Sequence, residues 1–83
     1  HRETAFNRWF AAIAADLGRR GIGKKRIAGV LGIGYEAVCT YCYCRQPKRV
    51  TWISICDGLV SLGVGRFADL YREIEMMYRG VYV

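Results

Sequence analysis

The chain has 83 residues, of which 53% are hydrophobic and 13% aromatic, and it carries a formal net charge of +6 at pH 7. This composition is too apolar for a disordered chain, yet no apolar run reaches the roughly 18 residues that a membrane-spanning helix needs. We therefore expect no membrane partner. A chain of this length forms a single domain, residues 1–83, with a core of modest size.

Catalytic residues are not evident in the sequence. The only histidine is His1, and no serine or cysteine has a base and an orienting partner near it along the chain, so we expect no enzymatic activity and no cofactor. The charged start, HRET, has no signal-peptide pattern, and four cysteines without such a segment indicate reduced thiols. These features predict a cytoplasmic protein.

The first predicted helix covers about residues 5–17, with Thr4 as its N-cap. Steps of three and four residues, typical of a helix with one buried face, separate its apolar side chains, Phe6, Trp9, Phe10, Ile13 and Leu17. Gly18 and Gly21 are expected to end this helix.

Residues 24–43 predict two short helices joined by a tight turn. Apolar residues at helical spacing, Ile27, Ala28 and Leu31, place the second helix at about residues 24–31. Gly32 interrupts the pattern, which then resumes in a third helix at about residues 35–43 with Ile33, Val38 and Tyr41. A small residue at position 28 and a glycine at the turn allow close helix packing and a positive φ, so the pair is typical of a helix-turn-helix unit.

Two further helices complete the pattern. The fourth is expected to begin after Thr51 as its cap, to end at Gly63, and to bury Trp52, Ile55, Cys56, Leu59 and Leu62. The fifth, about residues 66–79, carries one apolar stripe, Phe67, Leu70, Tyr71, Ile74, Met77 and Tyr78. This stripe either closes the core, forms a dimer interface, or serves both purposes. The tail, GVYV, is either a frayed end or a short strand that pairs with its copy in a second subunit. Together these elements predict an all-α, compact domain of four to five helices.

The basic charge is concentrated around the predicted helix-turn-helix. Residues 19–49 contain eight Lys and Arg residues and one acid, Glu36, so this window has a net charge of +7 and the remainder of the chain −1. Such a distribution is typical of a nucleic-acid surface, and the alternative is a merely solvated basic face.

With these residues in place, the segment KKRIAGVLGIGYEAVCTYCY resembles the lambda-repressor-like and Cro-like (XRE-type) helix-turn-helix family, in which Ala28, Gly32, Ile33 and Val38 occupy the characteristic spacing. The resemblance implies a fold of four or five helices, homodimeric binding to an operator in double-stranded DNA, and regulation of transcription. We expect a phage or prophage repressor of the Cro type, in the cytoplasm of a bacterium or a phage-infected host. Lys24 stands where the family often has Gln, so we expect it to contact phosphate directly.

The third helix is expected to enter the major groove with five side chains near the bases: Tyr35, Glu36, Cys39, Thr40 and Tyr43. Glu36 has an alternative role as a favourable charge at a helix N-terminus. Six basic residues on either side are expected to bind phosphates: Lys24, Lys25, Arg26, Arg45, Lys48 and Arg49.

The four cysteines leave three interpretations open: plain thiols, a redox-sensitive thiol, or a structural zinc site. We expect no metal, because Cys39 and Cys44 should point away from the core while Cys42 and Cys56 point toward it. Two alternatives to a DNA-binding repressor remain: a protein-interaction module such as an antitoxin or anti-repressor, and a redox-responsive DNA-binding regulator.

Overall fold

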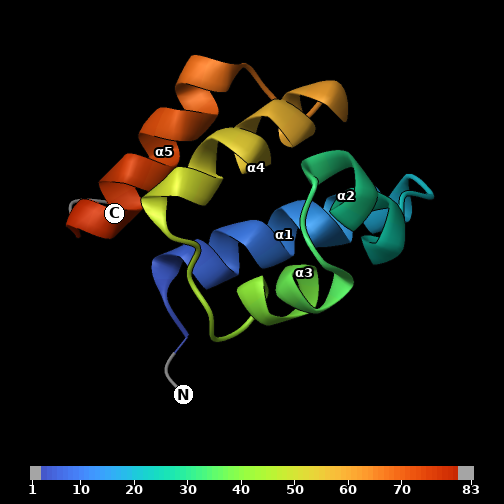
Figure 1. The fold of residues 1–83 in the computed structure, drawn as a ribbon, viewed down its shortest axis with the longest axis horizontal. Coiled ribbons are helices and arrows are strands. Elements are labelled where there is room, and N and C mark those ends of the chain that lie inside the picture. Colours follow the sequence, from blue (N-terminus) through green and yellow to red (C-terminus); the bar gives the residue numbers. More distant parts are fainter. Residues whose placement is uncertain (1–2, 81–83) are drawn as a thin grey trace.

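In the computed structural model, which describes residues 3–80, the chain folds into five helices (Figure 1). Their bounds are Ala5–Arg19 for α1, Lys24–Leu31 for α2, Tyr35–Tyr41 for α3, Arg49–Ser61 for α4 and Phe67–Arg79 for α5. No strand occurs within residues 3–80, so the predicted all-α fold is confirmed. The tail, for which the sequence allows β pairing, lies from Val81 onward outside the described residues.

The start of α1 follows the prediction. Thr4 is the N-cap, and its side chain forms a capping box with Asn7: the backbone N–H of Asn7 donates to Thr4 Oγ1 (3.2 Å), and the backbone N–H of Thr4 donates to Asn7 Oδ1 (2.9 Å). The end was predicted wrongly, because Gly18 remains helical and α1 continues to Arg19. The chain reverses at Gly21, whose φ of 87° suits a glycine.

The turn between α2 and α3 forms at the predicted residues. Gly32 ends α2 with a φ of 71°, and Ala28 is buried at the contact between the two helices. Val38 and Tyr41 are buried as expected. The third helix is shorter than predicted, because it ends at Tyr41 and the next residues turn back, with the amides of Cys44 and Arg45 donating to the Thr40 carbonyl. Tyr43 therefore follows α3 and is not part of it.

The fourth helix begins before the predicted cap. Lys48 occupies the N-cap position without a side-chain hydrogen bond, and Thr51 lies inside α4. Within α4, Gly58 packs directly against Leu31 of α2, where a Cβ atom would come within 2.9 Å of the Leu31 Cα. This close approach brings α2 and α4 together.

The apolar stripe of α5 mainly closes the core. Of the six residues of this stripe, Leu70, Ile74 and Met77 are buried within the single chain, so these three close the core and have little exposed surface for a dimer contact. Tyr71 is half-buried, while Phe67 and Tyr78 remain 38% and 36% exposed.

The helices pack around α1. In Figure 1, α1 crosses the middle of the molecule, with α3 on one side and α4 and α5 on the other. The contacts agree, since α1 touches α2, α3 and α5, while α4 packs on α2 and α5. None of the helices described has the length and apolar character that crossing a membrane requires.

Candidate nucleic-acid interface

The predicted base-contacting side chains lie on α3 and in the turn after it. Tyr35 is 50% exposed and Tyr43 62% exposed, Glu36 is exposed, and Cys39 and Thr40 are half-buried. Thr40 uses its hydroxyl hydrogen within the helix, donating to the Glu36 carbonyl at 2.9 Å, so its methyl group and lone pairs are what remain for a ligand. A side-chain hydrogen bond with Cys39 raises the pKa of Tyr35. Four of these side chains thus lie on α3, and Tyr43 lies in the turn after it.

The basic residues near α3 differ from those elsewhere in their ion pairing. Among the ion pairs of residues 3–80, none involves five of the six predicted phosphate-contacting residues: Lys24, Lys25, Arg26, Arg45 and Lys48. Most other arginines described are paired with a carboxylate: Arg8, Arg19, Arg20, Arg66 and Arg79. Positive charge is therefore left uncompensated on both sides of α3.

Arg49 is the exception among the six. Its guanidinium lies 3.3 Å from Glu75 Oε2 and 5.1 Å from the centre of the Trp52 ring. Because a neighbouring carboxylate offsets its charge, Arg49 is a weaker candidate for phosphate than Lys48 beside it. Arg45, in contrast, stacks over the Tyr41 ring at 5.5 Å and makes no ion pair.

The segment between α3 and α4 is held by two side-chain donors, of which Trp52 is buried and Tyr78 is partly exposed. Tyr78 donates its hydroxyl to the Pro47 carbonyl at 2.5 Å, and the Trp52 indole donates to the same oxygen at 3.4 Å. Burial raises the pKa of Tyr78 to about 12, so this donor stays protonated at neutral pH. The basic residues of this segment therefore stand on a fixed backbone.

A residue that the sequence reasoning missed holds the other end of this segment. Asn7 is fully buried, and its side-chain amide donates to the carbonyls of Tyr41 (2.9 Å) and Arg45 (2.8 Å). The only available signal was a polar residue among the apolar positions of the first helix, three residues after the Thr4 cap.

The cysteines are arranged as expected. Cys42 and Cys56 are buried, while Cys39 and Cys44 are half-buried. Burial raises the pKa of Cys42 and that of Cys56, the latter to about 11 with the Asp57 charge adding to the effect. Within residues 3–80, no group of three or more His, Cys, Asp or Glu side chains is placed to hold a metal ion.

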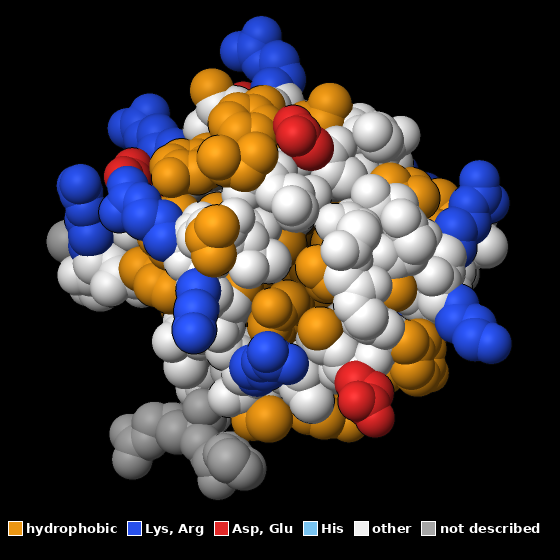
Figure 2. Space-filling view, in the orientation of Figure 1, with side chains coloured by type: hydrophobic (Ala, Val, Ile, Leu, Met, Phe, Trp, Pro, Cys, Tyr) orange, Lys and Arg blue, Asp and Glu red, His pale blue; other side chains and the backbone are white. Residues whose placement is uncertain are grey.

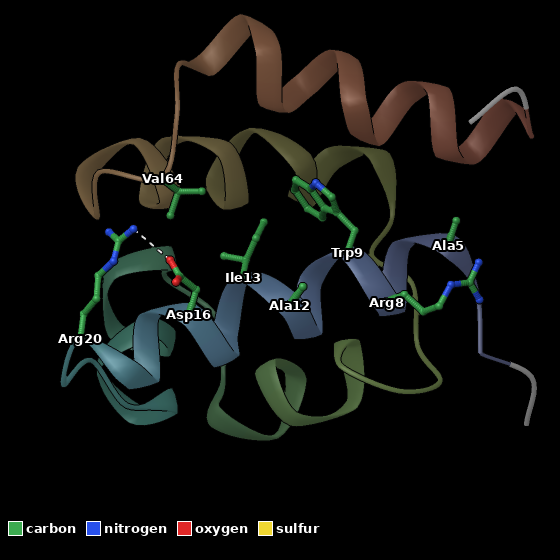
Figure 3. Close-up of a pocket in the computed structure, with 8 residues that line it drawn as sticks. All are labelled: Ala5, Arg8, Trp9, Ala12, Ile13, Asp16, Arg20 and Val64. Atoms are coloured by element: carbon green, nitrogen blue, oxygen red, sulfur yellow. Dashed lines mark ion pairs between the residues drawn. The ribbon is translucent and has the colours of Figure 1, made fainter. Parts of the chain in front are cut away.

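A pocket of about 490 Å³ lies on another part of the molecule (Figure 3). The Trp9, Ile13 and Val64 side chains point into the space between α1 and α4, and the Asp16–Arg20 ion pair lies at one end. The remaining lining residues are Ala5, Arg8 and Ala12, so the pocket contains none of the predicted DNA-contacting residues.

The surface also has an apolar region. Figure 2 shows hydrophobic side chains gathered where α4 and α5 lie side by side, while Lys and Arg side chains stand out around the edges and over the lower centre of the same face. The exposed apolar residues of α4 are Val50 at 81%, Ile53 at 54% and Val60 at 40%.

No known protein family, curated protein or solved structure was found to match this chain.

Proposed function

We propose that this chain is a sequence-specific, double-stranded DNA-binding regulator of transcription, acting as a homodimeric repressor of the Cro type. The observation that carries the proposal is the set of cations without ion pairs on both sides of the exposed face of α3. Leaving positive charge uncompensated favours a polyanionic ligand, because each phosphate contact also releases condensed counterions from the DNA.

In this mechanism α3 enters the major groove. Glu36 accepts a hydrogen bond from a cytosine amino group, and Tyr35 and Tyr43 contact neighbouring base edges. Lys24 and Lys25 at the start of α2, together with Arg45 and Lys48 after α3, bind phosphates on either side of the groove. Bound at a promoter, the protein excludes the transcription machinery.

The dimer contact in this proposal uses the apolar side chains that the monomer leaves exposed. On α5 these are Phe67 and Tyr78, with half-buried Tyr71 beside them, and on α4 they are Val50 and Ile53. A two-fold dimer would place its half-sites about one DNA turn apart, roughly 34 Å.

The test begins with selection of bound duplexes from a random DNA pool, followed by affinity measurements at several salt concentrations. Binding to a selected sequence should weaken steeply with salt, and Lys48→Ala should reduce the slope of log K against log salt by about one. Arg72→Ala is the matched control, because Arg72 also lacks an ion pair but lies on α5. It should leave the slope unchanged.

Indifference to duplex DNA would contradict the proposal and favour a protein-interaction module. A DNA affinity that changes on mild oxidation would instead favour a redox-responsive regulator, with half-buried Cys39 or Cys44 as the sensitive thiol.

A further inference from the structure

Asn7 is the one buried polar residue of the segment that the structure describes, and it is fully buried. A side-chain amide has two N–H donors and an oxygen with two lone pairs. Both donors are used, on the Tyr41 carbonyl and the Arg45 carbonyl, and both lone pairs accept hydrogen bonds, from the backbone N–H and the hydroxyl of Thr4 at 2.9 Å each. Every hydrogen-bonding site of the amide therefore has a partner.

The two carbonyls belong to α3 and to the basic segment after it, where the predicted DNA-contacting residues lie. Tyr41 is the last residue of α3, where carbonyls have no partner within the helix, and Arg45 is one of the free cations of the following segment. Asn7 reaches them across 34 and 38 residues of sequence. One side chain of α1 thus fixes both the end of α3 and the start of the basic segment.

Packing around Asn7 restrains rotation of α3 as well. The Tyr41 ring stands edge-on to the rings of Phe6 and Phe10, at centroid distances of 6.0 and 5.9 Å. These rings hold the side chain of Tyr41 while Asn7 holds its carbonyl. The orientation of α3 about its own axis, which decides where Glu36 and Cys39 point, is therefore set from α1.

We propose that Asn7 is a positioning residue for DNA recognition: it holds α3 and Arg45 in the orientation that reads one sequence in preference to others, without touching DNA itself. This inference rests on the proposed function. The side chains closest to Asn in shape cannot replace it, since Asp lacks the donors and Leu lacks both the donors and the acceptor, while Gln carries the same amide on a side chain one methylene longer.

The test compares Asn7→Asp with two controls. Asn7→Asp keeps the shape and the acceptor toward Thr4 but turns a carboxylate toward two carbonyl oxygens. Thr4→Ala removes the Thr4 hydroxyl and leaves the hydrogen bonds that the Asn7 amide donates to the carbonyls of Tyr41 and Arg45. Ile74→Val removes one methyl group from the core on α5, a helix that does not contact α3.

The readout is the ratio of affinities for a selected duplex and a scrambled one, measured where each variant is folded. For Asn7→Asp the ratio should fall by about tenfold, the discrimination that one good base contact supplies. Thr4→Ala and Ile74→Val should lower the melting temperature and keep the ratio. An unchanged ratio in Asn7→Asp, or an equal fall in Ile74→Val, would overturn the inference.

Two additions keep the test decisive. If Asn7→Asp does not fold, Asn7→Ser is measured instead, because the serine hydroxyl is too short to reach both carbonyls. This variant is made in a Gly29→Ala background, which should stabilise the protein, since Gly29 lies inside α2 and a Cβ atom there would meet nothing within 4 Å. Hydrogen exchange is also followed at the amides of Tyr43, Cys44 and Arg45, which donate to the Thr40 carbonyl. If the wild-type protein prefers no duplex, the proposed function fails, and hydrogen exchange alone decides the role of Asn7. Faster exchange in the Asn7 variant that is confined to these three amides supports positioning by Asn7. Faster exchange throughout the protein, or no change at all, overturns it.

Discussion

The hydroxyl of Tyr78 donates a 2.5 Å hydrogen bond to the carbonyl of Pro47, which ties the end of α5 to the segment between α3 and α4. The Trp52 ring lies between these parts of the chain, 4.6 Å from the Tyr78 ring, and its indole shares the same acceptor. The backbone that carries Lys48 thus depends on a side chain 30 positions further along the chain.

This bond predicts a specific response to alkaline pH. Burial raises the pKa of Tyr78 from 10.0 to about 12, so over that range the folded protein keeps a proton that the unfolded chain loses. The stabilisation is fully present below pH about 10 and is lost as the pH rises through about 12. Tyr78→Phe has no such proton, so its free energy of unfolding, measured with urea from pH 8 to 11.5, should fall less steeply than that of the wild-type protein. Tyr43→Phe is the control at an exposed tyrosine and should follow the wild-type curve.

Two glycines should respond in opposite ways to replacement by alanine. At Gly58 a Cβ atom would press on the side chain and the backbone of Leu31, so Gly58→Ala should destabilise the protein by about 1–3 kcal/mol. At Gly29, also inside a helix, a Cβ atom would meet nothing within 4 Å, and Gly29→Ala should stabilise it by about 0.5–1 kcal/mol. Thermal or urea unfolding measures both. A stabilising Gly58→Ala would show that α2 and α4 separate readily.

Glu36 should affect sequence preference and not merely charge. Glu36→Ala should relax the preference at one base pair by about 1–3 kcal/mol while slightly strengthening nonspecific binding, since a negative charge is removed. Asp57→Ala removes the same charge from an exposed position on α4, so it should leave the selected sequence unaltered. Repeating the random-pool selection with each variant provides the measurement. If Glu36→Ala also selects the wild-type sequence, Glu36 acts only as a charge at the start of α3.

The four thiols should divide into two kinetic classes. Cys39 and Cys44 are half-buried and should react readily with a water-soluble disulfide reagent at pH 8. Cys42 and Cys56 are buried with raised pKa values, and at a pKa of about 11 only about one Cys56 thiol in a thousand is ionised at that pH. Mass spectrometry of the labelled protein should show two fast modifications, with the remaining two appearing only on unfolding. Rapid labelling of all four in the folded protein would contradict the core assignment.

Features that depend on neighbouring residues could be predicted from the sequence, whereas some helix boundaries could not. Thr4 caps α1 as predicted because a capping box needs only neighbouring residues. Thr51 does not cap α4, because the helix begins three residues earlier, with Lys48 as an N-cap that makes no side-chain hydrogen bond. The third helix stops at Tyr41 because the amides of the following residues donate to the Thr40 carbonyl. The sequence has no glycine or proline at this point to indicate the end of the helix.

By itself, the sequence determined that this protein is a small all-α domain, that α2 and α3 meet at Gly32, and where the basic charge lies, because periodicity, turn chemistry and composition are properties of neighbouring residues. Only the tertiary structure decided that Leu70, Ile74 and Met77 close the core, and that Glu75 neutralises Arg49 while Lys48 stays free. It also decided that Asn7 holds α3. These relationships join residues 26 to 38 positions apart or depend on which side of a helix another helix covers, and the free energy of such contacts exists only once the helices have packed.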